Sequence, residues 1–432
     1  MEADRQRVDR ILRRMRASGL DALLCRLPHN VLMLAGYAPV TGDSFALFPL
    51  EGEPALVVPE SEQEMARRGW VNDVRTFATD TLRRMSTVEE MVEPILAQLA
   101  RERDLLGRMV GYEHQFGAVP ASYPQFAVTS PGTLQLFQEA FGDADWRPAD
   151  RELEDLEATL TEREVDMVRL ANLIAAHGIA AAREAIRSGI RECDVAGVVS
   201  DAVLRAGHRM EPVRRVTPFP HILSGPRTET AYRSFSHSSG RRIGRGEQVM
   251  VQLEVYLDGF WAEITRTFFV GEPNAEQRGA YEACLEAMER ARQVERPGVQ
   301  AAGVDIAART VLTKRGYGEA FRHGLGHGVG FQATSHQRPP RLHPASTDVL
   351  QVGMVHNAGP AVYMKQFGLR INDDVLVTDG APEQLTPLEK ELDWAICSRK
   401  RVTSVKAAQR PREAPPGIES GREPEGTPRE GG

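Results

Sequence analysis

The chain has 432 residues, of which 41% are hydrophobic, and this is enough apolar material for two separate cores. Its formal net charge of −7 comes without a run of Lys or Arg beside an aromatic stripe, so we expect no nucleic-acid partner. Four scattered cysteines form no C-x-x-C pair and no stretch approaches about 18 apolar residues, which favours a cytoplasmic protein with reduced thiols, no zinc cluster and no membrane partner.

The first part of the chain alternates helical and extended patterns. Apolar residues recur at helical spacing from Val8 to Met15, and Gly19 follows where a C-terminal cap would stand, so a helix is predicted over residues 4–18. Strands are predicted over residues 20–25, 45–49 and 55–58, and a helix over residues 88–103. This alternation is typical of an α/β domain.

A stretch rich in Pro, Gly and Ser follows over residues 116–150. It lacks periodicity, which predicts a linker and a domain boundary near residue 155. Thr161 and Glu164 then form a capping-box pattern, which predicts the start of a helix that continues to about Arg187.

The stretch from Gly246 to Gly271 has the pattern of two strands joined by a tight turn. Gln252 and Glu254 lie at period two on the first strand, Asp258-Gly259 supplies the turn, and Glu263 and Thr265 share a face of the second strand. Buried carboxylates on facing strands are unfavourable without a partner, so Glu254 and Glu263 indicate a ligand or proton-transfer site. The alternative is a hairpin face exposed to solvent.

The remaining chain contains one more long helix and a polar end. The helix is predicted over residues 275–294, before the helix breaker Pro297-Gly298. After about Arg399 almost no apolar residue occurs, and such a segment cannot bury enough surface to offset its ordering entropy. The predicted organisation is therefore two domains, residues 1–155 and 156–398, and a disordered tail over residues 399–432.

The hairpin resembles the ligand hairpin of the pita-bread superfamily, which includes methionine aminopeptidases, aminopeptidase P, prolidase and creatinase. The matching residues are Gly246, Val249, Asp258-Gly259-Phe260, Ile264-Thr265-Arg266-Thr267-Phe268 and Val270-Gly271. The run GLDALLCRLPHNVLMLAGY resembles the N-terminal domain of creatinase and prolidase. These resemblances imply an α/β N-terminal creatinase-like domain followed by an α+β C-terminal pita-bread domain. They also imply a homodimer in which the N-terminal domain helps to position the partner's active site.

Four of the five positions that hold metal ligands in this family have changed here. Gln252 and Glu263 stand at its two Asp positions, Gly359 and Asn372 stand at its two Glu positions, and only His327, in HGLGHGVGF, is kept. A dinuclear site must offset four positive charges largely with carboxylates, whereas Gln and Asn are neutral, weak ligands. We therefore expect no bound metal and no other cofactor.

A relocated site is the alternative to a metal-free protein. Glu254, Glu263 and His327 could form a rebuilt single-metal site, because three such ligands can hold zinc or iron. His356 would face away from Gly359 across its strand unless a bulge intervenes, whereas Asn357 would share the face of Gly359.

Creatinase is the family's example of carbon–nitrogen bond hydrolysis without a metal, with a histidine base and carboxylates that hold a cationic guanidino group. Its base position falls near Tyr232, and a histidine, His237, follows five residues later. Its glutamate position is Gly359, and the arginine that binds the substrate carboxylate aligns with Asp43. The chain is therefore not expected to be a creatinase that acts on creatine.

These patterns together predict a metal-independent, creatinase-like hydrolase that cleaves a carbon–nitrogen bond in a small nitrogenous, cationic substrate. His327 or His323 would be the acid/base, and Glu254 and Glu263 would hold positive charge. Glu254, Glu263 and His327 would line one water-accessible pocket. The expected substrate-binding residues are Gln252, Tyr232, His237, His336, Asn357, Asn372 and Arg370. The alternatives are an Xaa-Pro peptidase with a rebuilt metal site and a non-catalytic module that binds a peptide or protein partner.

Overall fold

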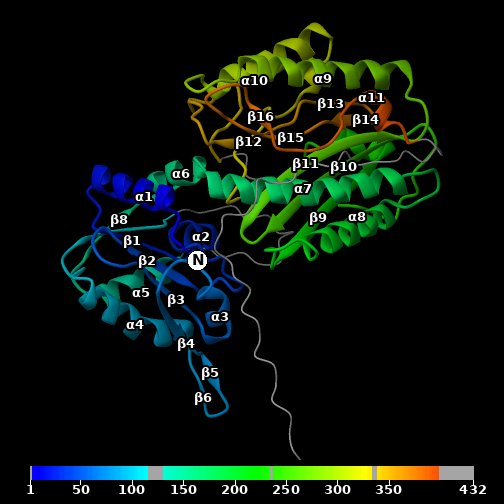
Figure 1. Cartoon of the computed structure of the whole chain (residues 1–432). Coiled ribbons are helices and arrows are strands. Elements are labelled where there is room, and N and C mark those ends of the chain that lie inside the picture. The colour runs from blue at the N-terminus through cyan, green and yellow to red at the C-terminus, as the bar shows by residue number, and fades with distance from the viewer. Residues whose placement is uncertain (1, 115–129, 234–236, 333–337, 398–432) are drawn as a thin grey trace, which may run out of the picture. The chain divides into compact units, whose positions relative to one another are not determined.

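The computed structural model describes residues 2–114, 130–233, 237–332 and 338–397. The N-terminal part forms a six-stranded mixed sheet in the order β4-β3-β2-β1-β7-β8. β1 pairs with β2 in antiparallel fashion and with β7 in parallel fashion. The strands are β1 (Ala22–Cys25), β2 (Phe45–Pro49), β3 (Ala55–Pro59), β4 (Asp73–Phe77), β7 (Met109–Tyr112) and β8 (Asp145–Pro148). A short hairpin, β5 (Asp80–Thr81) and β6 (Arg84–Met85), extends away from this sheet (Figure 1).

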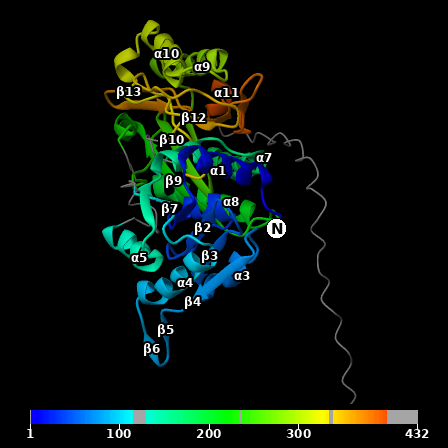
Figure 2. The ribbon, with the colours of Figure 1, turned by 90° about the vertical axis from the view of Figure 1, so that its left-hand side faces the viewer.

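Helices cover both faces of the N-terminal sheet. Alternate residues of β1 enter two different cores, Leu23 and Cys25 on one face and Ala22 and Leu24 on the other. The helices are α1 (Arg5–Ser18), α2 (Pro28–Ala35), α3 (Gln63–Ala66), α4 (Val88–Glu102) and α5 (Pro131–Phe141). α4 and α5 lie side by side (Figure 2) and contribute to the same core. The strands and helices predicted before residue 104 are confirmed within a few residues.

The predicted linker over residues 116–150 is wrong for its second half. Residues 130–150 contain α5 and β8, and β8 completes the edge of the sheet beside β7. Pro131 stands in the first turn of α5, and Ser130 accepts a hydrogen bond from the backbone N–H of Thr133. Pro and Ser are here the start signal of a helix rather than loop residues, which composition alone did not distinguish. Residues 115–129 lie outside the described residues.

The C-terminal part is built on a three-stranded antiparallel sheet in the order β11-β10-β9. A second sheet, β12-β15-β16, is joined to it by a bridge between Thr265 and Asn372. The strands are β9 (Val216–Ser224), β10 (Gln248–Leu257), β11 (Phe260–Phe269), β12 (Val355–Ala358), β15 (Asp373–Leu376) and β16 (Glu383–Gln384), beside the pair β13 (Ala361–Met364) and β14 (Phe367–Arg370).

Long helices pack on these sheets in two groups. α7 and α8 form a core with β9, β10 and β11, and α9 and α10 form a second core with β13 and β14 (Figure 1). The helices are α6 (Asp150–Ala158), α7 (Glu162–Ala185), α8 (Glu192–Gly207), α9 (Ala275–Val294), α10 (Ala301–Lys314) and α11 (Leu392–Ala395). The capping box at Thr161 and Glu164 starts α7 as predicted. α7 is long and apolar enough to cross a membrane by composition, but 56% of its most apolar window is buried, as in a core helix.

The tip of the β10–β11 hairpin depends on a glycine. Asp258 and Gly259 both have positive φ, 48° and 101°, as a tight two-residue hairpin turn requires. A Cβ at Gly259 would overlap the side chain of Leu32 and lie 2.9 Å from Cβ of Ala38. The architecture as a whole is the predicted α/β domain followed by an α+β domain. The predicted tail falls on residues 398–432, which lie outside the described residues.

Candidate functional site

The register of β10 and β11 places two acidic side chains directly opposite each other. Glu254 pairs with Glu263, and Gln252 pairs with Thr265. Glu254 and Glu263 are only 1% and 2% exposed, so the solvent-exposed hairpin face is excluded. The hairpin and the shared face of these residues are confirmed.

His327 approaches this acidic pair from a loop between α10 and β12. Its Nε2 atom lies 3.4 Å from Oε2 of Glu263. The flanking glycines allow the loop to pack closely, because a Cβ at Gly326 would lie 2.6 Å from Oδ1 of Asn357 and a Cβ at Gly328 would overlap the backbone of Pro339. The two glycines of the Gly-His-Gly sequence therefore allow His327 to pack closely against β12.

Asn357 on β12 holds His327 at two points. Its Oδ1 accepts a hydrogen bond from the backbone N–H of His327 at 2.9 Å, and its Nδ2 lies 3.1 Å from the ring Nε2. The other ring nitrogen, Nδ1, lies 3.1 Å from the carbonyl of Gly328. Nε2 of His327 thus lies between the amide of Asn357 and the carboxylate of Glu263. As predicted, Asn357 faces the site, whereas His356 faces away and pairs with Glu295 at 2.9 Å.

Arg370 and Asn372 hold the carboxylate of Glu263. Nη2 of Arg370 lies 3.2 Å from Oε1 of Glu263, and Nδ2 of Asn372 lies 3.4 Å from the same oxygen. Nδ2 of Asn372 also donates to the backbone carbonyl of Glu263 at 3.2 Å. We call Glu254, Glu263, His327, Asn357 and Arg370 the carboxylate site.

Glu254 is held by two neighbours on the more open side of the carboxylate site. Nε2 of Gln252 donates to its Oε1 at 2.6 Å, and Nε2 of His221 lies 3.5 Å from its Oε2. Gln252 and His221 are half-buried. Burial, followed by the neighbouring charge of Glu263, raises the pKa of Glu254 to about 8.

Several buried polar atoms around the site have no hydrogen-bond partner among the described residues. They are Oε2 of Glu254, Oγ1 of Thr265, Nε of Arg370, Oδ1 of Asn372 and Oδ1 of Asp374. Asp374 lies next to the site, where its other oxygen accepts from the backbone N–H of Glu263 at 3.0 Å. Buried donors and acceptors are usually satisfied, so this concentration indicates that the site takes a polar ligand or water.

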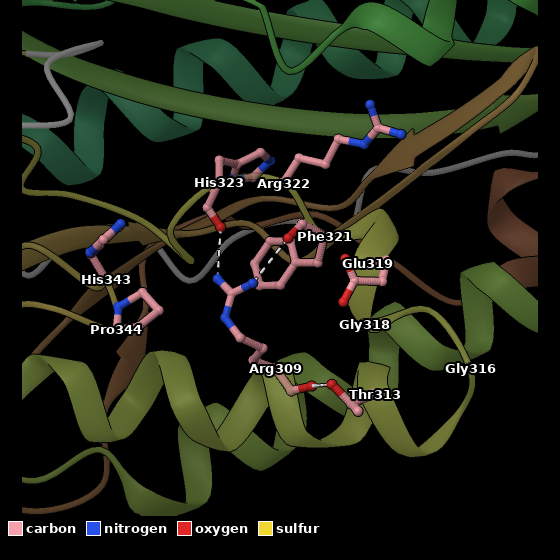
Figure 3. Close-up of a pocket in the computed structure, with 10 residues that line it drawn as sticks. All are labelled: Arg309, Thr313, Gly316, Gly318, Glu319, Phe321, Arg322, His323, His343 and Pro344. Carbon is pink, nitrogen blue, oxygen red and sulfur yellow. Dashed lines mark hydrogen bonds between the residues drawn. The ribbon is translucent and has the colours of Figure 1, made fainter.

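A separate pocket lies beside His323. It has a volume of about 750 Å³ and is lined by Arg309, Thr313, Gly316, Gly318, Glu319, Phe321, Arg322, His323, His343 and Pro344 (Figure 3). Its lining does not include Glu254, Glu263 or His327, which are buried. That Glu254, Glu263 and His327 line one water-accessible pocket stays a prediction.

His323 belongs to an aromatic cluster at the edge of this pocket. Its Nε2 lies 3.2 Å from the hydroxyl of Tyr363, and the Tyr363 and Tyr232 ring centroids are 5.4 Å apart. Nη1 of Arg322 donates to the hydroxyl of Tyr232 at 3.2 Å. Hydrogen bonds with Arg233 and then Arg322 lower the pKa of Tyr232.

The other predicted residues have separate positions. His237 is exposed, and its ring centroid lies 6.3 Å from that of His221. His336 lies outside the described residues. Asp43 forms an ion pair with Arg26 at 3.7 Å. Sequence reasoning missed His221 and Asp374, and the alternation of Thr217, Phe219 and His221 on β9 is the signal that could have revealed the first of them.

The two parts of the chain each match a known protein family. Residues 7–158 match the creatinase/prolidase N-terminal domain, and residues 166–379 match metallopeptidase family M24. The chain carries an M24 domain. It is 28% identical over 403 residues to an Xaa-Pro dipeptidase of Pyrococcus furiosus, a match that covers 90% of this chain and 99% of the relative. A putative dipeptidase, YkvY, of Bacillus subtilis is 27% identical and covers 89% and 99%.

Solved structures of prolidases share this two-domain fold. The crystal structure of the prolidase from Pyrococcus horikoshii OT3 has a TM-score of 0.71 at 29% identity, covering 90% of this chain and 99% of that one. The prolidase from Pyrococcus furiosus has a TM-score of 0.69, also at 29% identity. The M24 domain thus lies in a hydrolase family and follows a creatinase-like α/β domain.

The M24 family implies a metal centre, but the residues present here do not fit a dinuclear one. Oε1 of Glu263 faces Arg370 and Asn372, and Nε2 of His327 faces the amide of Asn357. Gly359 has no side-chain donor, and Asn372 and Gln252 are neutral. No three His, Cys, Asp or Glu side chains in the described part of the chain are placed to hold a metal ion, and this includes Glu254, Glu263 and His327.

Proposed function

We propose that this M24 domain hydrolyses a carbon–nitrogen bond of a small, peptide-like substrate at the carboxylate site. The observation that carries the proposal is the buried pair Glu254 and Glu263, placed opposite each other with His327 3.4 Å from Glu263. Two buried carboxyl groups and a histidine are the groups that proton transfer during hydrolysis requires. The hydrolase family and the dipeptidase names of the relatives support the same type of bond.

The site divides the proton-transfer roles between its two carboxyl groups. Glu263 faces the Arg370 guanidinium, which favours its ionised form, and with His327 it can accept a proton from an attacking water molecule. Glu254 lies on the opposite strand beside Gln252 and His221, and its carboxyl group can donate a proton to the departing nitrogen. The water oxygen then bonds to the carbonyl carbon, the carbon–nitrogen bond breaks, and the amine leaves protonated.

Arg370 changes the substrate class that the sequence predicts. Glu254 and Glu263 were expected to hold a cationic group, but an internal cation already faces Glu263 at 3.2 Å. A second cation at that carboxylate would be repelled by the guanidinium. The proposed scissile group is therefore a neutral amide rather than a guanidinium.

A second candidate is an Xaa-Pro dipeptidase that works with a metal on other ligands. The names of the relatives favour it, because full-length matches at 28% and 29% identity are Xaa-Pro dipeptidases. Its substrate would also be a small peptide, but its activity would depend on added metal.

One experiment tests both candidates. The protein is incubated with Xaa-Pro dipeptides, other dipeptides, small amides and guanidines, with EDTA or with Mn²⁺, and each mixture is followed by mass spectrometry. We expect the wild type to consume a neutral amide or dipeptide in EDTA. We expect His327→Gln to reduce turnover by about 100- to 10,000-fold, the usual contribution of a positioned acid/base.

The control for this variant is His208→Gln, at an exposed histidine that follows α8. It should turn over substrate at the wild-type rate. Consumption only in Mn²⁺ would favour the dipeptidase with a metal, and equal turnover by His327→Gln would remove His327 from the chemistry. If no small molecule is consumed under any condition, the non-catalytic binding module replaces both candidates.

A further inference from the structure

Arg370 and Gly359 pack against each other in the carboxylate site. A Cβ added to Gly359 would lie 2.6 Å from Nε and 3.0 Å from Nη2 of Arg370, and 2.9 Å from Oδ1 of Asn372. Real Cβ atoms do not approach other atoms this closely. Gly359 is not among the glycines with positive φ. It is therefore the space taken by Arg370, and not the backbone conformation, that calls for glycine at this position.

The guanidinium of Arg370 is buried together with the carboxylate that it neutralises. Arg370 is 9% exposed and Glu263 is 2% exposed, and their closest atoms are 3.2 Å apart. A buried ion pair is tolerated because each charge compensates the other, and removal of one partner leaves an uncompensated charge. The pair thus supplies, from within the chain, the positive charge that Glu263 requires.

We propose that the Arg370 guanidinium is the resident cation of the carboxylate site, where it neutralises Glu263 and excludes divalent cations from the space beside Glu263 and His327. The absence of a side chain at Gly359 leaves room for this guanidinium. The proposal concerns the occupancy of the site and does not depend on the proposed function.

The exclusion follows from charge and from geometry. A divalent cation bound to Glu263 would lie within about 4 to 6 Å of the guanidinium, where repulsion between buried like charges far exceeds thermal energy. Oε1 of Glu263 is also already directed at Arg370 and Asn372.

The test compares four forms of the full chain by thermal unfolding and by titration calorimetry with MnCl₂, CoCl₂ and ZnCl₂. They are the wild type, Arg370→Lys, which keeps the charge, Arg370→Gln, which removes it, and the double variant Glu263→Gln/Arg370→Gln. We expect no binding by the wild type or by Arg370→Lys. We expect Arg370→Gln to bind at least one of the metals at least about 10-fold more tightly and to melt at least about 2 °C higher in about 1 mM metal.

The double variant identifies the charge that binds the metal and controls for folding. It should not respond to metal, because the freed carboxylate has been removed with its partner. It should also melt above Arg370→Gln in the absence of metal, because it buries no unpaired charge. If Arg370→Gln does not fold while the double variant does, the ion pair is supported by that difference.

Three results would overturn the proposal. The first is wild-type protein that binds a divalent cation with a Kd below about 10 μM, a strength at which the site would be occupied. The second is an Arg370→Gln variant that folds and ignores all three metals. The third is a double variant that binds metal as well as Arg370→Gln, or melts below it. None of these measurements depends on catalytic turnover. They therefore test the role of Arg370 even if the protein proves not to be a hydrolase.

Discussion

Glu113 is a buried acidic residue far in sequence from the carboxylate site. It is 3% exposed and accepts hydrogen bonds from the backbone N–H groups of Arg26 and Leu27 and from Nδ2 of Asn30, at the start of α2. Burial raises its pKa to about 7, and these hydrogen bonds offset the shift only in part. Its protonation therefore couples the stability of the N-terminal domain to pH.

The direction of this coupling depends on proton binding in the two states. Unfolded chain loses the Glu113 proton near pH 4.5, and native chain loses it near pH 7, so between these values the native state binds more protons. The stabilising contribution of the protonated group is complete below about pH 4.5 and is lost as pH rises through about 7. The difference corresponds to about 3 kcal/mol in the free energy of unfolding.

Glu113→Gln should remove this pH dependence. We expect the free energy of unfolding of the wild type, measured with urea, to fall between pH 5 and pH 8 by about 2 to 3 kcal/mol more than that of the variant. Glu53→Gln, at an exposed glutamate, should behave like the wild type. A parallel pH profile for Glu113→Gln and the wild type would contradict the shift.

At the residue scale, the sequence could predict only the positions that strand periodicity determines. Period two placed Glu254 and Glu263 on one face, and the same rule placed Asn357 inward and His356 outward. The resemblance placed Arg370 at the site, but the sequence could not show that its guanidinium faces Glu263, because that position depends on the missing side chain at Gly359, between β12 and β13. For that reason the observed site, in which Arg370 already faces Glu263, differs from the expected site, in which Glu254 and Glu263 hold a cationic substrate.

Among the elements, the β10–β11 hairpin has a turn with two separate requirements. Gly259 has a φ of 101°, which L-residues rarely adopt, and its Cα faces Leu32 and Ala38 without room for a Cβ. Gly19, the cap of α1, has a φ of 62°, but a Cβ added there would meet no atom within 4 Å. A comparison of the two positions therefore separates the effect of backbone strain from the effect of steric overlap.

Gly259→Ala should destabilise the protein more than Gly19→Ala. For Gly19→Ala we expect a loss of about 1 kcal/mol in the free energy of unfolding, from the left-handed backbone alone. For Gly259→Ala we expect about 2 to 4 kcal/mol, because the new methyl group must also displace Leu32. Urea denaturation of both variants measures the difference, and equal losses would mean that the hairpin tip can move away without penalty.

Most of the helices predicted from the sequence begin at a side-chain cap. The cap at Thr161 predicted α7, while α1 and α9 were predicted from other signals and prove to begin at side-chain caps as well, Asp4 and Asn274. α10 begins after Gln300 without a side-chain cap, and no helix was predicted there. α5 has a cap at Ser130, but its position inside a Pro-, Gly- and Ser-rich stretch concealed the signal.

The whole molecule is expected to form a homodimer, and this stays a prediction. It rests on the resemblance of the N-terminal domain to that of creatinase and prolidase, where this domain helps to position the partner's active site, and on the frequency of two-fold pairs. Sedimentation at micromolar concentration should give twice the chain mass of 47.8 kDa. A monomer over the whole concentration range would contradict it and would remove the expected role of the N-terminal domain at the partner's site.

The contact between Gly359 and Arg370 also constrains how this chain can change over evolutionary time. Glycine and glutamate codons can differ by a single nucleotide, so a glutamate at position 359 is within easy mutational reach. Its side chain would nevertheless meet the guanidinium, since even a Cβ would lie 2.6 Å from Nε of Arg370. A glutamate at this position therefore requires the Arg370 side chain to shift, so a substitution at residue 359 would change the partner of Glu263 as well.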